Sequence, residues 1–86
     1  MSGIRIGQVT HFYDKIKVAV IITTATIQVG DMVHFLGHST DFKQEVTSLQ
    51  IEHQGVNEVG SGQEVAMKVS QTVHPKDAVY KLTEEE

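Results

Sequence analysis

Apolar and polar residues alternate along residues 15–23, and this alternation is the clearest structural signal in the chain. Because successive side chains of a β-strand point to opposite faces, the pattern predicts a half-buried strand. Its inward face is predicted to consist of Ile16, Val18, Val20 and Ile22. Ala19 and Ile21 are then expected to face outward, although both are apolar.

Similar runs follow along the chain, and no window shows helical spacing of apolar residues. Strands are predicted over residues 4–12, 15–23, 32–36, 42–53, 64–70 and 78–82, with 27–29 as a short lead-in. The odd spacing of Val46 and Leu49 indicates a β-bulge near Thr47 and Ser48, because one extra residue moves later side chains to the other face. Residues 54–63 contain three glycines and are predicted to form the longest loop.

Glycine and proline mark the predicted turns. Gly30 and Asp31 form a tight turn before residues 32–36, where glycine tolerates a positive φ. Pro75 lies in a turn before the last strand. Strands separated by turns at short, regular intervals are typical of a sandwich or a barrel, and at this length closure is favoured because it removes exposed edges.

The sequence therefore predicts an all-β fold, a small closed barrel of six to seven strands. Residues 1–82 are expected to form a single domain, and residues 83–86 an acidic tail. The predicted core consists of Val18, Val20, Val33, Phe35, Val65, Met67 and Val69.

Composition narrows the function classes. The 86 residues include no cysteine, which excludes disulfides, thiolate metal sites and cysteine nucleophiles and favours an intracellular protein. The N-terminus lacks the apolar stretch of a signal peptide, and the longest apolar run, residues 18–22, is too short to cross a bilayer. We expect a cytoplasmic protein that does not associate with membranes.

The charge balance is acidic. The sequence has seven Lys and Arg residues and eleven Asp and Glu residues, which gives a net charge of −4. Autonomous nucleic-acid binding requires a basic surface instead. Arg5, Lys15 and Lys17 lie close in sequence and form the candidate RNA-binding patch. The alternative is that all three are ordinary solvent-facing residues of an antiparallel sheet.

Six segments in order resemble the second domain of translational GTPases of the elongation factor Tu and initiation factor two type. These segments are residues 6–12, 17–20, 27–31, 46–50, 62–69 and 76–80. They also resemble the related barrel at the C-terminus of certain collagenase-like peptidases. The resemblance implies a closed Greek-key barrel and a free-standing translation-factor-like protein, with Gly30, Asp31 and Gly62 as structural turn residues.

The chain has no glycine-rich phosphate loop with its lysine, so it is not expected to bind a nucleotide or to be a GTPase. No cofactor is expected. The five histidines do not cluster in sequence with other ligands, so no metal site is assigned and a histidine metal-binding protein is the third hypothesis. No spacing singles out a catalytic pair among Glu45, Glu52, Glu58 and Glu64, and we expect no enzymatic activity.

The remaining signal is an excess of apolar residues. Ala19 and Ile21, together with Met32 and Leu36, form a candidate patch for a partner or for a second copy of the chain; the alternative is that the loop at 54–63 covers it. The first hypothesis is a non-enzymatic binding module for a protein, the ribosome or RNA. The alternative is a structural, homo-oligomerising barrel with no nucleic-acid role.

Overall fold

A computed structural model describes residues 3–82 of the chain. Every regular element in this part is a β-strand, so the predicted all-β class is confirmed. The strands are β1 (Gly3–Tyr13), β2 (Val18–Thr23), β3 (Ile27–Gln28), β4 (Met32–Leu36), β5 (Asp41–Glu45), β6 (Leu49–Ile51), β7 (Gln54–Val56), β8 (Glu58–Val59), β9 (Glu64–Lys68) and β10 (Ala78–Leu82). In the described residues no helix is long and apolar enough to span a membrane. The predicted acidic tail lies outside them.

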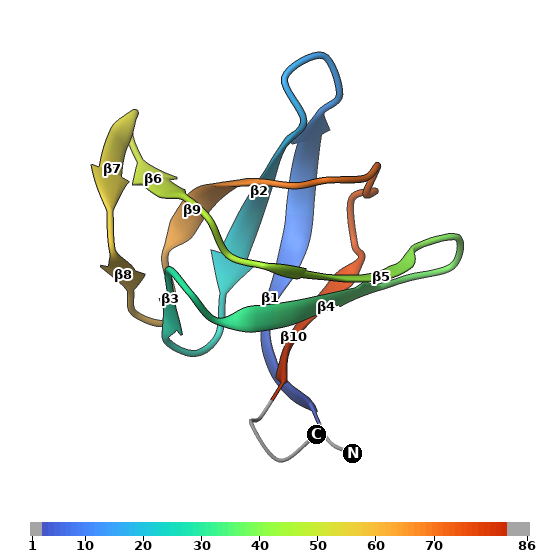
Figure 1. Cartoon of the computed structure of the whole chain (residues 1–86), viewed down its shortest axis with the longest axis horizontal. Coiled ribbons are helices and arrows are strands. Elements are labelled where there is room, and N and C mark those ends of the chain that lie inside the picture. Colours follow the sequence, from blue (N-terminus) through green and yellow to red (C-terminus); the bar gives the residue numbers. More distant parts are fainter. Residues whose placement is uncertain (1–2, 83–86) are drawn as a thin grey trace.

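Eight strands form one antiparallel sheet in the order β5-β4-β10-β1-β2-β9-β6-β7, and β3 pairs with β8 in a separate ribbon. Figure 1 shows the sheet curled on itself, with the β1–β2 hairpin projecting from the body and the β6–β7 hairpin standing beside it. Within the described residues no ladder joins β5 to β7, so this order has two ends where a closed barrel has none.

The first strand connects the two halves of the sheet because it is bent. β1 pairs with β10 near its start and with β2 from Gly7 onward. Its register shifts between Arg5 and Gly7 and again between Val9 and His11. Such bulges bend a strand and increase its twist. One continuous segment can therefore line the core on both sides, and the sequence pattern did not indicate either bulge.

The interior is apolar and continuous. Phe35 and Phe42 lie opposite each other on β4 and β5 with their rings stacked at 5.1 Å. The predicted core is correct for five residues, which are Val33, Phe35, Val65, Met67 and Val69. It is wrong for Val18 and Val20, which are only half-buried, and Ile16 is 58% exposed in the turn before β2.

The predicted face of β2 is inverted. Ala19 and Ile21, assigned above to an exposed patch, are 0% and 1% exposed. They lie opposite Met67 and Val65, and directly opposed residues of two strands share a face. Residues 18–22 are apolar on both faces, so alternation alone could not choose the inner one, and the chain at 14–17 is a turn rather than the start of the strand.

Two other predicted segments differ from the structure. The strand expected over residues 42–53 is divided into β5 and β6, which pair with different neighbours. The break at residues 46–48 accommodates the odd spacing of Val46 and Leu49 without a bulge inside a single strand. The loop expected over residues 54–63 contains β7 and β8.

We expect Ile21→Ala to lower the free energy of unfolding by about 2–5 kcal/mol, because the side chain is completely enclosed and its loss leaves a cavity. Ile22→Ala removes the same atoms one position along, from a half-buried site, and should cost less than about 1.5 kcal/mol. Urea denaturation of both variants checks this. Equal losses, or a larger loss for Ile22→Ala, would contradict the register.

Candidate functional site

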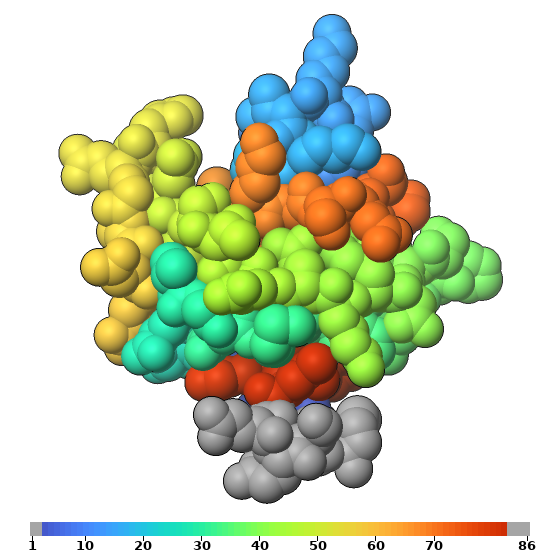
Figure 2. Space-filling view, in the orientation of Figure 1, coloured from blue at the N-terminus to red at the C-terminus, as the bar shows by residue number. Residues whose placement is uncertain are grey.

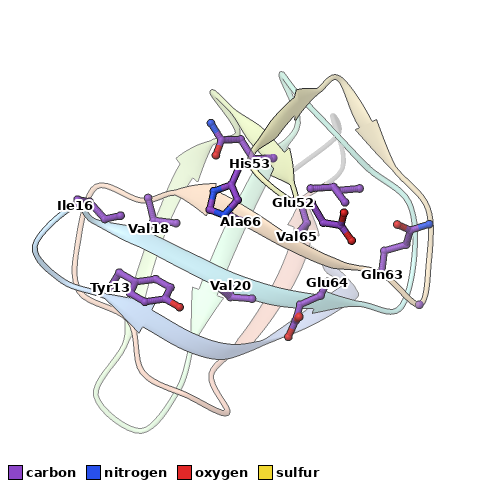
Figure 3. A pocket seen from close by; sticks show the side chains of 13 residues that line it. Tyr13, Ile16, Val18, Val20, Glu52, His53, Gln63, Glu64, Val65 and Ala66 are labelled. Carbon is purple, nitrogen blue, oxygen red and sulfur yellow. The ribbon is translucent and has the colours of Figure 1, made fainter.

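An open groove of about 800 Å³ lies on the outer face of β2, β9 and β6. One wall is the β1–β2 hairpin, which contributes Tyr13 and Ile16, and the opposite wall is the β6–β7 turn, with Glu52 and His53. Figure 2 shows these hairpins projecting with a notch between them. In Figure 3 the groove extends from Tyr13 and Ile16 at one end to Gln63 at the other.

The floor of the groove is apolar. Val18 and Val20 of β2 and Ala66 of β9 point out of the core. Gln50 of β6, the cross-strand partner of Ala66, continues this face, and Ile51 also lines the groove while packing against the core. Val20 and Ala66 are direct cross-strand partners. The inward orientation of Ala19 and Ile21 places these apolar neighbours outside, because the side-chain period of a strand is two.

The β6–β7 turn has an unusual sequence for its geometry. Ile51 pairs with Gln54, so Glu52 and His53 form a two-residue loop, and their φ angles are 50° and 70°. Positive φ at both positions is the requirement of a type I′ turn, which normally contains Asn-Gly. Each left-handed non-glycine residue costs about 1 kcal/mol or more. The fold therefore holds two strained residues at the edge of the groove.

Hydrogen bonds fix one end of the groove, and a ring contact supports the other. Thr23, at the end of β2, donates from Oγ1 to the Gly60 carbonyl at 2.6 Å and accepts from the Gln63 backbone N–H at 3.0 Å. These bonds hold the segment that leads into Glu64. At the opposite end, the ring of Tyr13 lies 4.3 Å from that of His11, which supports an aromatic side chain that is 50% exposed.

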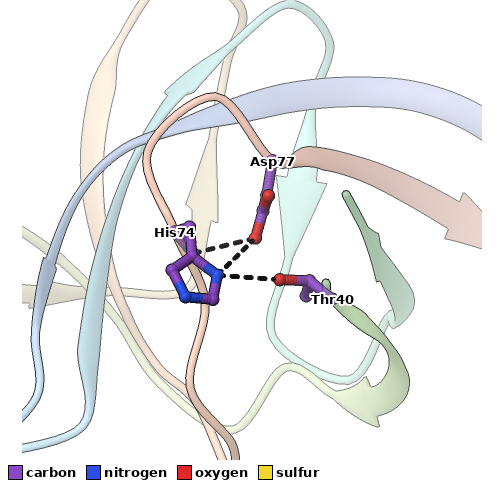
Figure 4. Close-up of polar contacts among 3 residues, drawn as sticks. All are labelled: Thr40, His74 and Asp77. Atoms are coloured by element: carbon purple, nitrogen blue, oxygen red, sulfur yellow. Dashed lines mark hydrogen bonds and ion pairs between the residues drawn. The ribbon is translucent and has the colours of Figure 1, made fainter. Parts of the chain in front are cut away.

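A second polar cluster lies away from the groove. Thr40 Oγ1 is 3.2 Å from His74 Nδ1, and Asp77 Oδ2 is 3.8 Å from the same nitrogen (Figure 4). A nucleophile–base–acid relay requires contacts at the two different ring nitrogens. Thr40 is also only 3% exposed. The cluster is structural: the Asp77 carboxylate accepts the His74 backbone N–H at 2.8 Å and closes the loop before β10.

The predicted RNA-binding cations are not brought together. Arg5 lies near the start of β1, whereas Lys15 and Lys17 lie in the turn beyond its end. These positions are separated by most of the length of an eleven-residue strand, about 25 Å. Within residues 3–82 no three His, Cys, Asp or Glu side chains form a metal-binding group.

The predicted turn residues have the geometry that their assignment requires. Gly30 and Gly62 have φ angles of 100° and 77°, in the left-handed region that favours glycine. The Asp31 carboxylate accepts the Gln28 backbone N–H at 2.9 Å and lies 3.6 Å from Lys81 Nζ.

The sequence pattern does not predict the groove as a site. The pattern places Val18 and Val20 in the core, and it singles out no pair among the acids that include Glu52 and Glu64. The available signal was the apolar run at 18–22, which is too apolar on both faces for a strand with one solvated side.

No family model matches the chain. It is 37% identical over 82 residues to an uncharacterized protease of Methanocaldococcus jannaschii, a match that covers 94% of this chain and 20% of that protein. The chain therefore spans about a fifth of the length of the curated relative.

Two solved structures share the fold. One is the C-terminal domain of a Geobacillus thermoleovorans protein designated a U32 peptidase, with a TM-score of 0.87, 21% identity and coverage of 92% of each chain. The other is the selenomethionine variant of that domain, with a TM-score of 0.86, 21% identity and coverage of 90% of this chain and 98% of that one.

These findings correct the family prediction. The assignment to the second domain of translational GTPases is wrong, and with it the function of a translation-factor-like module for a protein, the ribosome or RNA. The segments behind that resemblance contain strand alternation and glycine turns, which any small β-domain requires, so they do not discriminate between families. The comparisons also count against the expectation of no enzymatic activity, because the chain is similar to parts of proteins named protease and peptidase.

We expect Gly37→Ala to lower the free energy of unfolding by about 2 kcal/mol or more. A Cβ at this position would fall on the carboxylate of Asp77, which is only 5% exposed and cannot move without breaking its bond to His74. Gly55→Ala is the matched control, because its Cβ would meet nothing within 4 Å. Thermal denaturation of both variants is the measurement, and a neutral Gly37→Ala would contradict this packing.

Proposed function

We propose that this chain is a substrate-docking domain of the U32 peptidase type, and that its groove holds an extended segment of polypeptide. The observation that carries the proposal is the apolar floor between two projecting hairpins. In addition, 94% of this chain matches part of a protein named protease. The fold shared with a U32 peptidase C-terminal domain supports the placement in that type of protein.

The form of the groove suits a peptide. Its volume of about 800 Å³ lies in the usual range for binding sites, and its floor offers methyl groups with polar side chains at the borders. An extended peptide presents alternate side chains to such a surface and leaves its backbone near the polar border. A nucleic-acid strand fits less well, because its phosphates would lie beside Glu52 and Glu64.

In this proposal the chain binds substrate and does not cleave it. Cleavage requires a nucleophile beside a base, and the Thr40–His74–Asp77 cluster has both contacts on one ring nitrogen. The relative named protease is about five times as long as this chain, so its activity is assigned to the larger polypeptide.

We further propose that the sheet functions as a closed Greek-key barrel that keeps the groove rigid. β5 and β6 are consecutive, and they pair with β4 and β9 on opposite sides of the sheet. The Gln44 side chain of β5 supports closure because it bonds to the backbone at the end of β9 and just beyond it. Its amide nitrogen donates to the Lys68 carbonyl at 2.8 Å, and its oxygen accepts the Ser70 N–H at 2.8 Å, as a backbone ladder would.

Gln44→Ala is expected to lower the free energy of unfolding by about 1–2 kcal/mol, because two backbone groups lose their partner at the seam. Amide exchange of Ser70 should accelerate in parallel. Gln54→Ala, at an exposed position of β7, is the control and should be close to neutral. If the amide exchange rate of Ser70 is unchanged in Gln44→Ala, Gln44 does not hold the two edges of the sheet together.

The docking function is tested by NMR titration of the labelled chain with a synthetic peptide of alternating valine and polar residues. We expect chemical-shift changes at Val18, Val20 and Ala66, with a dissociation constant of about 0.1–1 mM for so short a ligand. Val20→Ser should weaken binding about fivefold, because it removes apolar contact area. Val29→Ser, at a 41% exposed valine outside the groove, should have no effect. Binding unaffected by Val20→Ser would contradict the proposal.

A further inference from the structure

We infer that the groove selects peptide segments in which a lysine or arginine lies between apolar residues, with Glu52 and Glu64 receiving the cation. This inference rests on the proposed docking function and adds the substrate class. Its basis is the charge of the groove together with the spacing of its apolar floor.

The lining of the groove carries two carboxylates and neither lysine nor arginine. Glu52 comes from the β6–β7 turn and Glu64 from the start of β9, so the two acids approach the groove from different elements (Figure 3). Within residues 3–82 neither carboxylate forms an ion pair with a lysine or an arginine. The groove is therefore complementary to a cation and repels an anion.

Among the described residues that line the groove, the other titratable side chains are His53, which follows Glu52 in the turn, and Tyr13 at the far end. His53 is exposed, and in its neutral form it leaves the negative charge of the rim unopposed. A peptide that carries aspartate or glutamate at the rim would face two like charges, which is the arrangement that discriminates against wrong partners.

The floor fixes the expected order of residues in the ligand. Val18 and Val20 are two residues apart on one face of β2, with Ala66 beside Val20. An extended peptide that packs side chains i and i+2 on this surface turns side chain i+1 away from it. A lysine or arginine at i+1 has a long apolar stem that can bend to the border and bring its charge to the carboxylates.

The strained turn provides an unusual control. Replacing Glu52 and His53 by Asn-Gly supplies the residues that a type I′ turn prefers, so the urea midpoint should rise. The same change removes one carboxylate from the groove, so the preference for a cationic peptide should fall. A purely structural turn would gain stability without any change in peptide selection.

The experiment compares three peptides on the full chain by NMR titration. They have the order valine–X–valine–X–valine, with X as lysine, as the uncharged isostere norleucine, or as glutamate. We expect the lysine peptide to bind about three- to tenfold more tightly than the norleucine peptide at low salt, from two exposed ion pairs. The glutamate peptide should bind more weakly than either. High salt should remove the difference between lysine and norleucine.

Glu52→Gln combined with Glu64→Gln should abolish the lysine preference, so that the lysine and norleucine peptides bind this variant equally tightly. The matched control is Glu45→Gln combined with Glu58→Gln, two exposed acids that do not line the groove. Equal binding of lysine and norleucine peptides, or a preference that survives the first double variant, would overturn the inference and leave the docking function standing. Failure of all three peptides to shift groove resonances would reject the docking function itself.

Discussion

The pairing of β2 with β9 is the constraint on which the rest of this structure depends. It places Ala19 opposite Met67 and Ile21 opposite Val65, so both pairs face the core. A shift of one residue would exchange the two faces of β2 completely. The same parity that encloses Ile21 leaves Val20 outside, and the apolar floor of the groove is therefore a direct consequence of how the core is packed.

An apolar outer face is costly when water covers it, and the two hairpins beside it limit that exposure. The β1–β2 hairpin shields one side with Tyr13, and the β6–β7 hairpin stands on the other. The β6–β7 hairpin reverses direction through a two-residue turn in which Glu52 and His53 have left-handed backbone conformations. Strain of this kind persists where the surroundings determine the backbone, and it commonly accompanies binding sites.

The sequence was sufficient for the parts of the fold that depend on local signals. The strand Met32–Leu36 has the predicted bounds, and the turn glycines Gly30 and Gly62 have positive φ. The face of β2 could not be predicted, because residues 18–22 are apolar on both sides and only cross-strand partners decide between them. The groove could not be predicted either, since it joins three distant segments and positive φ at Glu52 and His53 has no mark in the sequence.

The electrostatic character of the groove is local rather than a property of the net charge. At physiological ionic strength, screening limits the reach of an exposed charge to about 8 Å, so the overall charge of −4 contributes little at any one point. Glu52 and Glu64 act because they border a surface that already holds the apolar part of a ligand close to them. Apolar contact then supplies affinity and the carboxylates supply selection, which is the division expected when exposed ion pairs are individually weak.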